Sequence, residues 1–132
     1  MGKIKMLGYQ INEHSFKNEL PGGSKINIAA KHSYNVRYGD QNRCRGELIS
    51  EIYDKDNPDK FNIKVVICGI FAHDGGFDKP HLHVETFKAL FPYARSFVAM
   101  MTAACGIPAL MIPEIDIESH EIISFNNPSA DK

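Results

Sequence analysis

The first half of the chain alternates apolar and polar residues with a period of two. In residues 26–38, INIAAKHSYNVRY, the even positions include Ile28, Tyr34 and Val36, and the odd positions are mostly polar. Successive side chains of a β-strand point to opposite faces, so this alternation predicts a strand with one buried face. His32 interrupts the apolar row, and we interpret it as a histidine that is satisfied within the fold or placed at a strand end.

Three further segments show the same alternation and complete a predicted sheet. Residues 44–56 and 61–71 are bounded by turn-forming residues at 39–42 and 57–59. Within residues 7–16 the parity of the apolar positions changes, which predicts a bulge or a break between two short strands. Short turns between alternating strands favour antiparallel pairing. The pattern therefore predicts an α+β fold with a four-stranded antiparallel meander.

The second half of the chain predicts a long crossover loop and then one long helix. Residues 72–85 contain two adjacent glycines, a proline and three histidines, which is typical of a loop. From residue 91 onward, apolar residues recur at helical spacing; Pro92 suits the first turn, and Gly106 suits the end. The helix has two adjacent apolar stripes: Phe91, Ala94, Val98, Met101 and Cys105 form the first, and Phe97, Met100 and Ala104 form the second.

Two apolar stripes are more than one sheet face can cover. Between Phe91 and Cys105 the only charged residue is Arg95, whereas a surface helix of a monomer normally has a charged face. We therefore expect a homo-oligomer, with an interface made of Phe91, Ala94, Phe97, Val98, Met101 and Cys105. The alternative is that the second stripe packs on the loop and the C-terminal segment of the same chain.

Composition narrows the class of protein. The chain has 132 residues, 43% apolar and 23% charged, which fits one domain, residues 1–125, followed by a disordered tail, residues 126–132. A net charge of −1 gives no bulk reason to bind nucleic acid or an anionic membrane. The sequence shows no membrane-spanning run and no signal peptide. Three widely spaced cysteines favour a reduced, cytoplasmic protein.

Three motifs resemble the signature of the SecB chaperone family. They are GIF at residues 69–71, LFPYAR at 90–95 and GIPALMIPEIDI at 106–117, and they occur in the family's order. The resemblance covers most of residues 5–118. It implies a four-stranded sheet backed by a long helix, in chains that pair and then stack through their helices into a tetramer, a dimer of dimers.

The resemblance also implies a function without chemistry. Members of the family bind unfolded polypeptides or preproteins in long apolar grooves, without nucleotide or cofactor. Some deliver preproteins to the export motor ATPase, and others protect the antitoxin of a toxin–antitoxin pair. Near the predicted loop and helix start, the candidate polypeptide-binding residues are Phe71, Phe77, Leu82, Phe87, Leu110 and Ile112. Ordinary core packing is the alternative for each of them.

The sequence departs from the exporting members where those contact the motor. The contact uses acidic side chains, and the corresponding positions here are Lys64, Glu13 and Lys17, so two of three charges are reversed. Like charges across an interface are costly. The end of the chain, HEIISFNNPSADK, lacks a cysteine cluster and a helical pattern. We therefore expect a client or partner other than the export motor.

Two alternatives from other classes stay open. The first is a dedicated partner-binding protein, for example one specific for an antitoxin. The second is a metal-dependent enzyme, because His73, Asp74, Asp78, His81 and His83 lie within eleven residues and such side chains bind zinc or copper. A polar loop explains the same residues. No nucleophile and base pair carries a supporting local signature, so we expect no enzyme and no metal.

Overall fold

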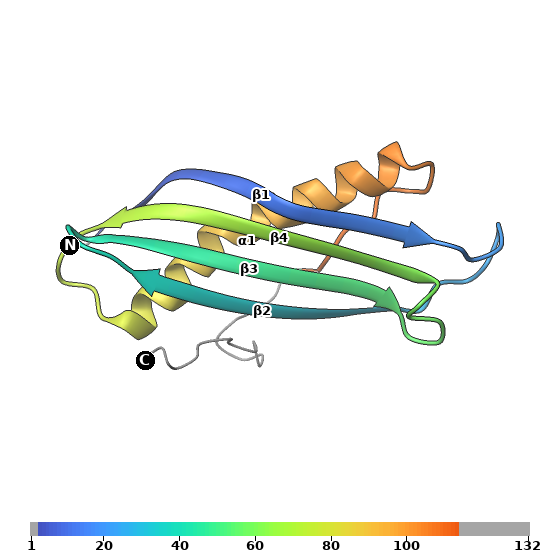
Figure 1. The fold of residues 1–132 in the computed structure, drawn as a ribbon, viewed down its shortest axis with the longest axis horizontal. Helices are drawn as coiled ribbons and strands as arrows, with labels where there is room; N and C mark the ends of the chain where they lie inside the picture. Colours follow the sequence, from blue (N-terminus) through green and yellow to red (C-terminus); the bar gives the residue numbers. More distant parts are fainter. Residues whose placement is uncertain (1–2, 114–132) are drawn as a thin grey trace.

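The computed structural model describes residues 3–113, which form one antiparallel sheet and one helix (Figure 1). The strand order is β1-β4-β3-β2, and α1 packs against one face of the sheet. The elements are β1 (Ile4–Asn18), β2 (Ile28–Tyr38), β3 (Arg43–Asp54), β4 (Phe61–His73) and α1 (Lys79–Ala104). The predicted fold class, a four-stranded antiparallel sheet on one long helix, is confirmed. The tail predicted at 126–132 lies outside the described residues.

The predicted meander is confirmed for β2, β3 and β4, but not for β1. Hairpins join β2 to β3 and β3 to β4, but the segment after β1 carries the chain to the opposite edge, so that β1 pairs with β4. Alternation along a strand shows which side chains face the core, but it does not show which strands are neighbours.

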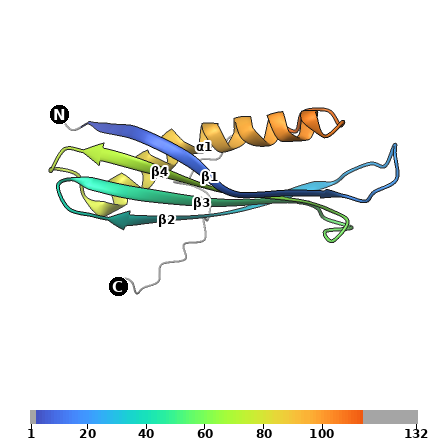
Figure 2. The same ribbon diagram turned by 45° about the horizontal axis from the view of Figure 1, so that its top comes forward.

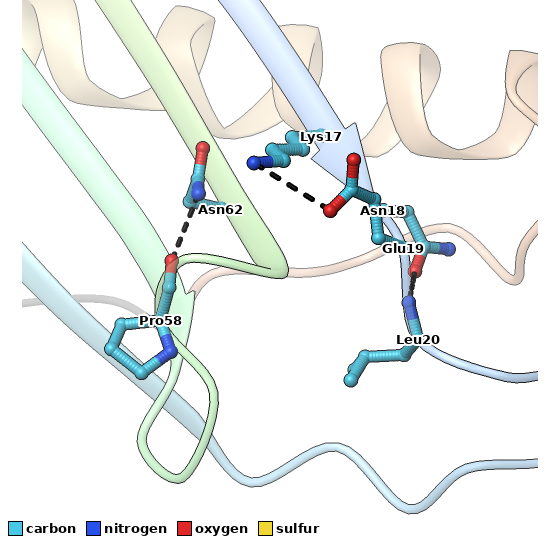
Figure 3. Close-up of polar contacts among 6 residues, drawn as sticks. All are labelled: Lys17, Asn18, Glu19, Leu20, Pro58 and Asn62. Carbon is cyan, nitrogen blue, oxygen red and sulfur yellow. Dashed lines mark hydrogen bonds and ion pairs between the residues drawn. The ribbon is translucent and has the colours of Figure 1, made fainter.

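Short polar contacts lie within the end of β1 and within the β3–β4 turn (Figure 3). Lys17 and Glu19 form an ion pair at 3.6 Å, and the backbone N–H of Leu20 donates to Asn18 Oδ1 at 3.2 Å. Nearby, the side chain of Asn62 donates to the carbonyl oxygen of Pro58 at 2.8 Å. These contacts satisfy polar groups where the ladder between β1 and β4 stops.

The parity change predicted near the N-terminus is a pair of bulges in one continuous strand. The pairing of β1 with β4 shifts between Met6 and Gly8 and again between Ile11 and Glu13. Leu7 and Asn12 are therefore the extra residues. The prediction of a bulge is confirmed, and the alternative of two separate strands is wrong.

The helix begins earlier than the sequence pattern predicted. Asp78 is the N-cap, and its Oδ1 accepts a hydrogen bond from the backbone N–H of His81 at 2.9 Å. Pro80 occupies the first turn, and Pro92 lies inside the helix. The loop predicted over 72–85 is confirmed only for residues 74–78, because β4 extends to His73 and α1 already begins at Lys79. The predicted end is confirmed, since Gly106 has a φ of 93°, a conformation that suits glycine.

The core lies between α1 and the inner face of the sheet. Its largest fully buried side chains include Tyr34, Phe61, Phe71 and Phe87. Figures 1 and 2 show α1 crossing the sheet diagonally, from its start near β2 to its end beyond β1. The first half of the helix therefore covers β2 to β4, and the second half reaches past the β1 edge.

His32 is a buried member of the inner face. Its Nδ1 shares a 2.8 Å hydrogen bond with Ser50 Oγ, and its ring contacts Phe91 edge-on. Its Nε2 has no hydrogen-bond partner among residues 3–113. Burial lowers the pKa of His32 to about 4, because the charged imidazolium would lose its hydration there. The interpretation as a histidine satisfied within the fold thus holds for one of its two ring nitrogens.

Candidate polypeptide-binding surfaces

The second half of α1 and the β1 edge form an exposed apolar strip, which consists of Leu7, Tyr9, Tyr93, Phe97 and Met100. Three of these residues lie on one side of the helix, at positions i, i+4 and i+7. The Tyr9 and Tyr93 rings are 4.5 Å apart between centroids, so strand and helix contribute to one continuous surface. Met100 is 63% exposed and Tyr9 is 48% exposed.

Polar groups are sparse along this strip. His14 of β1 packs edge-on against Phe97, with ring centroids 5.2 Å apart. The single charged residue of this half of the helix, Arg95, donates from Nε to the carbonyl oxygen of Ile112 at 2.6 Å. Arg95 therefore anchors the segment after the helix to the helix itself. The strip is left with large exposed apolar side chains, which are uncommon as a continuous patch on a small protein.

The predicted interface residues divide between the core and the surface. Phe91, Ala94 and Val98 are buried against the chain's own sheet. Met101 is half-buried against the same core, and Cys105 is exposed just beyond the helix. Phe97 is half-buried and belongs to the strip. Most of the first stripe is thus covered within the chain, whereas Met100 and Ala104 of the second stripe are exposed. The interface itself stays a prediction.

The predicted polypeptide-binding residues divide in the same way. Phe71, Leu82, Phe87 and Ile112 are at most 2% exposed, so in this structure they make the ordinary core contacts that were their alternative. Phe77 and Leu110 are half-buried and remain accessible. Their role in binding stays a prediction.

Phe77 borders a hollow at the start of the helix. The hollow has a volume of about 410 Å³, and its lining includes Ile4, Phe77, His81 and Ala89. The Phe77 ring lies 4.9 Å from the His81 ring and 6.3 Å from the His73 ring, between centroids. A hollow of this size, with an apolar wall and a few polar groups, can accept an apolar side chain of a bound peptide.

Leu110 belongs to the segment that follows the helix. Its backbone N–H donates to Thr102 Oγ1 at 2.9 Å, which fixes the segment at the end of α1. The next residue, Met111, is 62% exposed. Methionine is flexible and polarizable, so it adapts to different apolar partners.

The histidines near the helix start do not converge on a metal site. His81 and His83 both lie in α1. The His83 ring contacts Tyr34, whereas the His81 ring contacts Phe77. Within residues 3–113, no three histidine, cysteine, aspartate or glutamate side chains are placed to hold a metal ion.

The three positions compared with the exporting members, Glu13, Lys17 and Lys64, lie on the outer sheet face. Lys64 Nζ forms an ion pair with Glu13 Oε2 at 3.4 Å, and Lys17 pairs with Glu19. Both lysines are therefore matched to neighbouring acids of the same chain.

Sequence reasoning missed the strand side of the apolar strip. Leu7 is a bulge residue, and its exposure follows from the broken alternation. Tyr93 stands within the LFPYAR motif and Met100 within the second stripe, so their helical spacing was a usable signal. Tyr9 has the parity of a core residue, and only the diagonal course of α1 shows that it meets Tyr93 at the edge.

The architecture, four antiparallel strands packed on one helix, matches the fold of a solved protein. The structure resembles the SecB-like chaperone of Mycobacterium tuberculosis, solved in complex with a ChAD peptide from the HigA1 antitoxin. The TM-score is 0.68 at 13% sequence identity, and the match covers 86% of this chain and 88% of the other.

Sequence comparison identifies the family. The family model described as preprotein translocase subunit SecB matches residues 25–120, and the chain belongs to the SecB family. The protein-export protein SecB of Caulobacter vibrioides is 27% identical over 123 residues, which is 86% of this chain and 76% of that protein. SecB of Mesorhizobium japonicum is 40% identical over 60 residues, 42% of this chain and 35% of that protein. Within the described residues, no helix is long and apolar enough to cross a membrane.

Proposed function

We propose that this SecB-family chain is an ATP-independent holdase that binds unfolded polypeptides through exposed apolar side chains. The observation that carries the proposal is the amount of apolar surface that the fold leaves uncovered. Leu7, Tyr9, Tyr93, Met100 and Met111 are all large and at least 41% exposed. A chain of this size that worked alone would not need such a surface.

Two kinds of contact share this surface in the proposal. The apolar strip is continuous and follows one side of a helix, which suits packing against a second copy of the chain. The hollow beside Phe77, the half-buried side chain of Leu110 and the exposed side chain of Met111 are separate, smaller sites. They suit single apolar side chains of an extended client. A homo-oligomer, built as a dimer of dimers, would then present several such sites to one client.

The expected affinity fits a holdase. A site that buries about 400 Å² of client apolar surface gains roughly 10 kcal/mol before costs, at about 25 cal/mol per Å². Ordering the client and losing its translational freedom return much of this gain. One site then binds weakly, and several sites on one assembly raise retention through avidity. Weak, tolerant contacts allow clients to leave without nucleotide hydrolysis.

The proposal places the protein in the cytoplasm. Its three cysteines are all free thiols, two of them buried and one exposed. An exposed thiol such as Cys105 persists in a reducing compartment.

Light scattering tests the holdase activity. Several unrelated denatured proteins are diluted into buffer with the wild-type chain, Phe77→Asp or the matched control Phe77→Leu. We expect the wild type and Phe77→Leu to suppress aggregation of all clients. Phe77→Asp should suppress it much less, because a carboxylate disfavours the approach of an apolar side chain. Wild-type protein that leaves the aggregation of every client unchanged would end the proposal.

A dedicated partner-binding protein is the second candidate. The similar structure of M. tuberculosis holds an antitoxin peptide, and Lys17 and Lys64 on the outer face of this chain are paired internally. Both observations favour a partner other than the export motor. Suppression of aggregation for one cognate protein, and for none of the unrelated clients, would assign the chain to this class. A stable complex with the purified motor ATPase would instead assign it to export.

A further inference from the structure

The outer face of the sheet, opposite α1, carries a cluster of cations at one end. The cluster, here called the basic patch, consists of Lys5, Arg37, Arg43 and Arg45, all of them exposed. Their strand register places them together. Arg43 and Lys5 lie opposite the same residue, Ala72, from the two sides of β4, and Arg37 lies directly opposite Arg45.

The other end of the same face is charge-balanced. Lys64 pairs with Glu13, Lys17 pairs with Glu19, and Lys31 lies opposite Glu51. Within residues 3–113, no ion pair joins a member of the basic patch to an acid. Three acids lie at this end of the sheet: Glu47, which accepts from the Cys68 thiol at 3.6 Å, Asp40 in the β2–β3 turn, and Asp74, which accepts from the backbone N–H of Lys3 at 2.9 Å.

The arrangement of the patch costs stability in the absence of an anion. Arg37 and Arg45 are cross-strand neighbours, and like charges directly opposite each other on a sheet are destabilising. One arginine donates to a thiol rather than to a carboxylate: Arg45 lies 3.4 Å from Cys68 Sγ. A carboxylate bound between the two guanidinium groups would relieve this repulsion.

An apolar side chain lies inside the patch. Ile70 is directly opposite Arg45 on the neighbouring strand and is 41% exposed. The surface therefore offers guanidinium forks, which recognise carboxylates in a bidentate manner, around one apolar contact point.

We propose that the basic patch binds an acidic segment of a partner polypeptide, one in which acidic and aliphatic residues alternate. An extended segment presents alternate side chains to one surface, so its carboxylates would meet the arginines while an aliphatic residue covers Ile70. The patch lies on the sheet face opposite α1 and the hollow beside Phe77, and this proposal goes beyond the proposed holdase function.

A nucleic acid is a poorer match for this patch. Binding to a phosphate backbone gains affinity from many cations that each neutralise a phosphate. Four cations in a chain of net charge −1 can neutralise only a few phosphates. The apolar side chain of Ile70 at their centre would have no role in binding a phosphate backbone. Planar carboxylates beside an aliphatic side chain use every part of the patch.

Fluorescence anisotropy with a labelled peptide of alternating glutamate and leucine tests the proposal on the full chain. The control peptide has lysine in place of glutamate. We expect the acidic peptide to bind with a salt-sensitive affinity, and the basic peptide not to bind. The double variant Arg43→Glu, Arg45→Glu should weaken binding about tenfold or more, because several charge-assisted hydrogen bonds are lost.

Two further variants separate the patch from general effects of charge and folding. Lys17→Glu makes the same kind of reversal at the balanced end of the face and should change the affinity less than about twofold. Arg37→Gln with Arg43→Gln removes no contact to a buried group, and should weaken binding even if the double reversal fails to fold. Suppression of aggregation of unrelated clients should be unchanged in these variants, so failure of the holdase proposal would be seen separately.

Three results would overturn the proposal. The first is an affinity for the acidic peptide that none of the patch variants reduces. The second is binding of a single-stranded oligouridylate as tight as that of the peptide and equally dependent on the patch, which would assign the patch to nucleic acid. The third is peptide binding only after deletion of residues 114–132, which include Glu114, Asp116 and Glu118; that result would assign the patch to the chain's own segment.

Discussion

The two halves of α1 differ in what covers them. In the first half, Phe87 and Leu90 are buried, and the outward side carries His81, Glu85 and Lys88. In the second half, Ala94 and Val98 are buried, but the outward side carries Tyr93, Ser96 and Met100. The first half is thus an ordinary amphipathic helix with a charged face, and the second half is apolar on more than one side.

This difference separates residues that hold the fold from residues that serve contacts with other chains. The diagonal course of α1 brings its first half over β2 to β4 and its second half beyond the β1 edge (Figure 2). Substitutions in the first half should therefore act on the stability of the chain. Substitutions on the outward side of the second half should act on assembly.

Loss of a core aromatic side chain in the first half of α1 should lower the free energy of unfolding more than any other change considered below. Phe87 is 1% exposed and stacks on Phe91 with ring centroids 5.1 Å apart. Phe87→Ala should lower the free energy of unfolding by about 3–5 kcal/mol, because it removes buried surface and leaves a cavity. Chemical denaturation measures this effect. Phe97→Ala, in the second half of the helix, should lower the free energy of unfolding clearly less, because Phe97 is only half-buried. Equal losses would contradict the division of the helix.

Acid should lower the free energy of unfolding through His32, whose ring contacts Phe91 of α1. Its pKa is about 4 in the folded chain and about 6.5 when unfolded. The unfolded state binds the proton first, so stability falls as the pH drops from about 6.5 to about 4, by at most roughly 3 kcal/mol. Denaturation midpoints at several pH values measure this slope.

The variant His32→Gln isolates this contribution from other acid effects. Burial also lowers the pKa of His83, which adds to the slope in the same direction. The difference in slope between the wild type and His32→Gln belongs to His32 alone. Identical slopes in the two proteins would mean that His32 titrates as it does in the unfolded chain.

The hydrogen bond between the buried hydroxyls of Tyr34 and Thr86 should contribute about 1 kcal/mol to the free energy of unfolding. Tyr34 donates its hydroxyl to Thr86 Oγ1 at 2.6 Å, which links β2 to α1. Tyr34→Phe keeps the ring contacts with Phe87 and removes only this hydrogen bond. The measurement is again the free energy of unfolding, and a loss of more than about 3 kcal/mol would show that the ring packing had changed as well.

The smallest effect on the stability of the single chain is expected at Met100. Met100→Asp replaces a side chain that is 63% exposed, so the unfolding free energy of an isolated chain should stay within about 0.5 kcal/mol of the wild type. The native mass from sedimentation should fall, because a carboxylate would be buried in the interface between copies. Met100→Leu keeps the apolar surface and should keep the mass.

Met100 is also a sharper test than its neighbour. Met101 is half-buried against the chain's own core, so a charge there would disturb folding and assembly together. A wild-type chain that sediments as a single subunit would remove the role that we propose for the apolar strip.

Local patterns predicted most of the fold. Alternation identified all four strands because each has one face in the core, as with Tyr34 and Val36 in β2. The helix start was missed because the glycines, proline and histidines of residues 72–85 favoured a loop. The Asp78 cap with Pro80 in the first turn was the local signal that contradicted it. The place of β1 beside β4 depends on tertiary packing, which no local pattern contains.

The candidate site was predicted only in part, for a related reason. Helical spacing identified the second stripe, including Phe97 and Met100, as apolar surface in excess of what the sheet can cover. The predicted groove residues rested on a loop over 72–85. Once that segment is helical, Leu82 joins Phe87 in the core. The basic patch was not predicted, because its members come from three strands and meet only through the strand register.

The two bulges of β1 have a consequence for a protein that handles unfolded chains. Within residues 3–113, no strand pairs with the outer edge of β1, which offers a row of backbone donors and acceptors, the kind of template on which fibrils grow. The extra residues at Leu7 and Asn12 interrupt the spacing of that row. A captured strand can therefore align with it only over short stretches, so that the edge is a poor seed for amyloid.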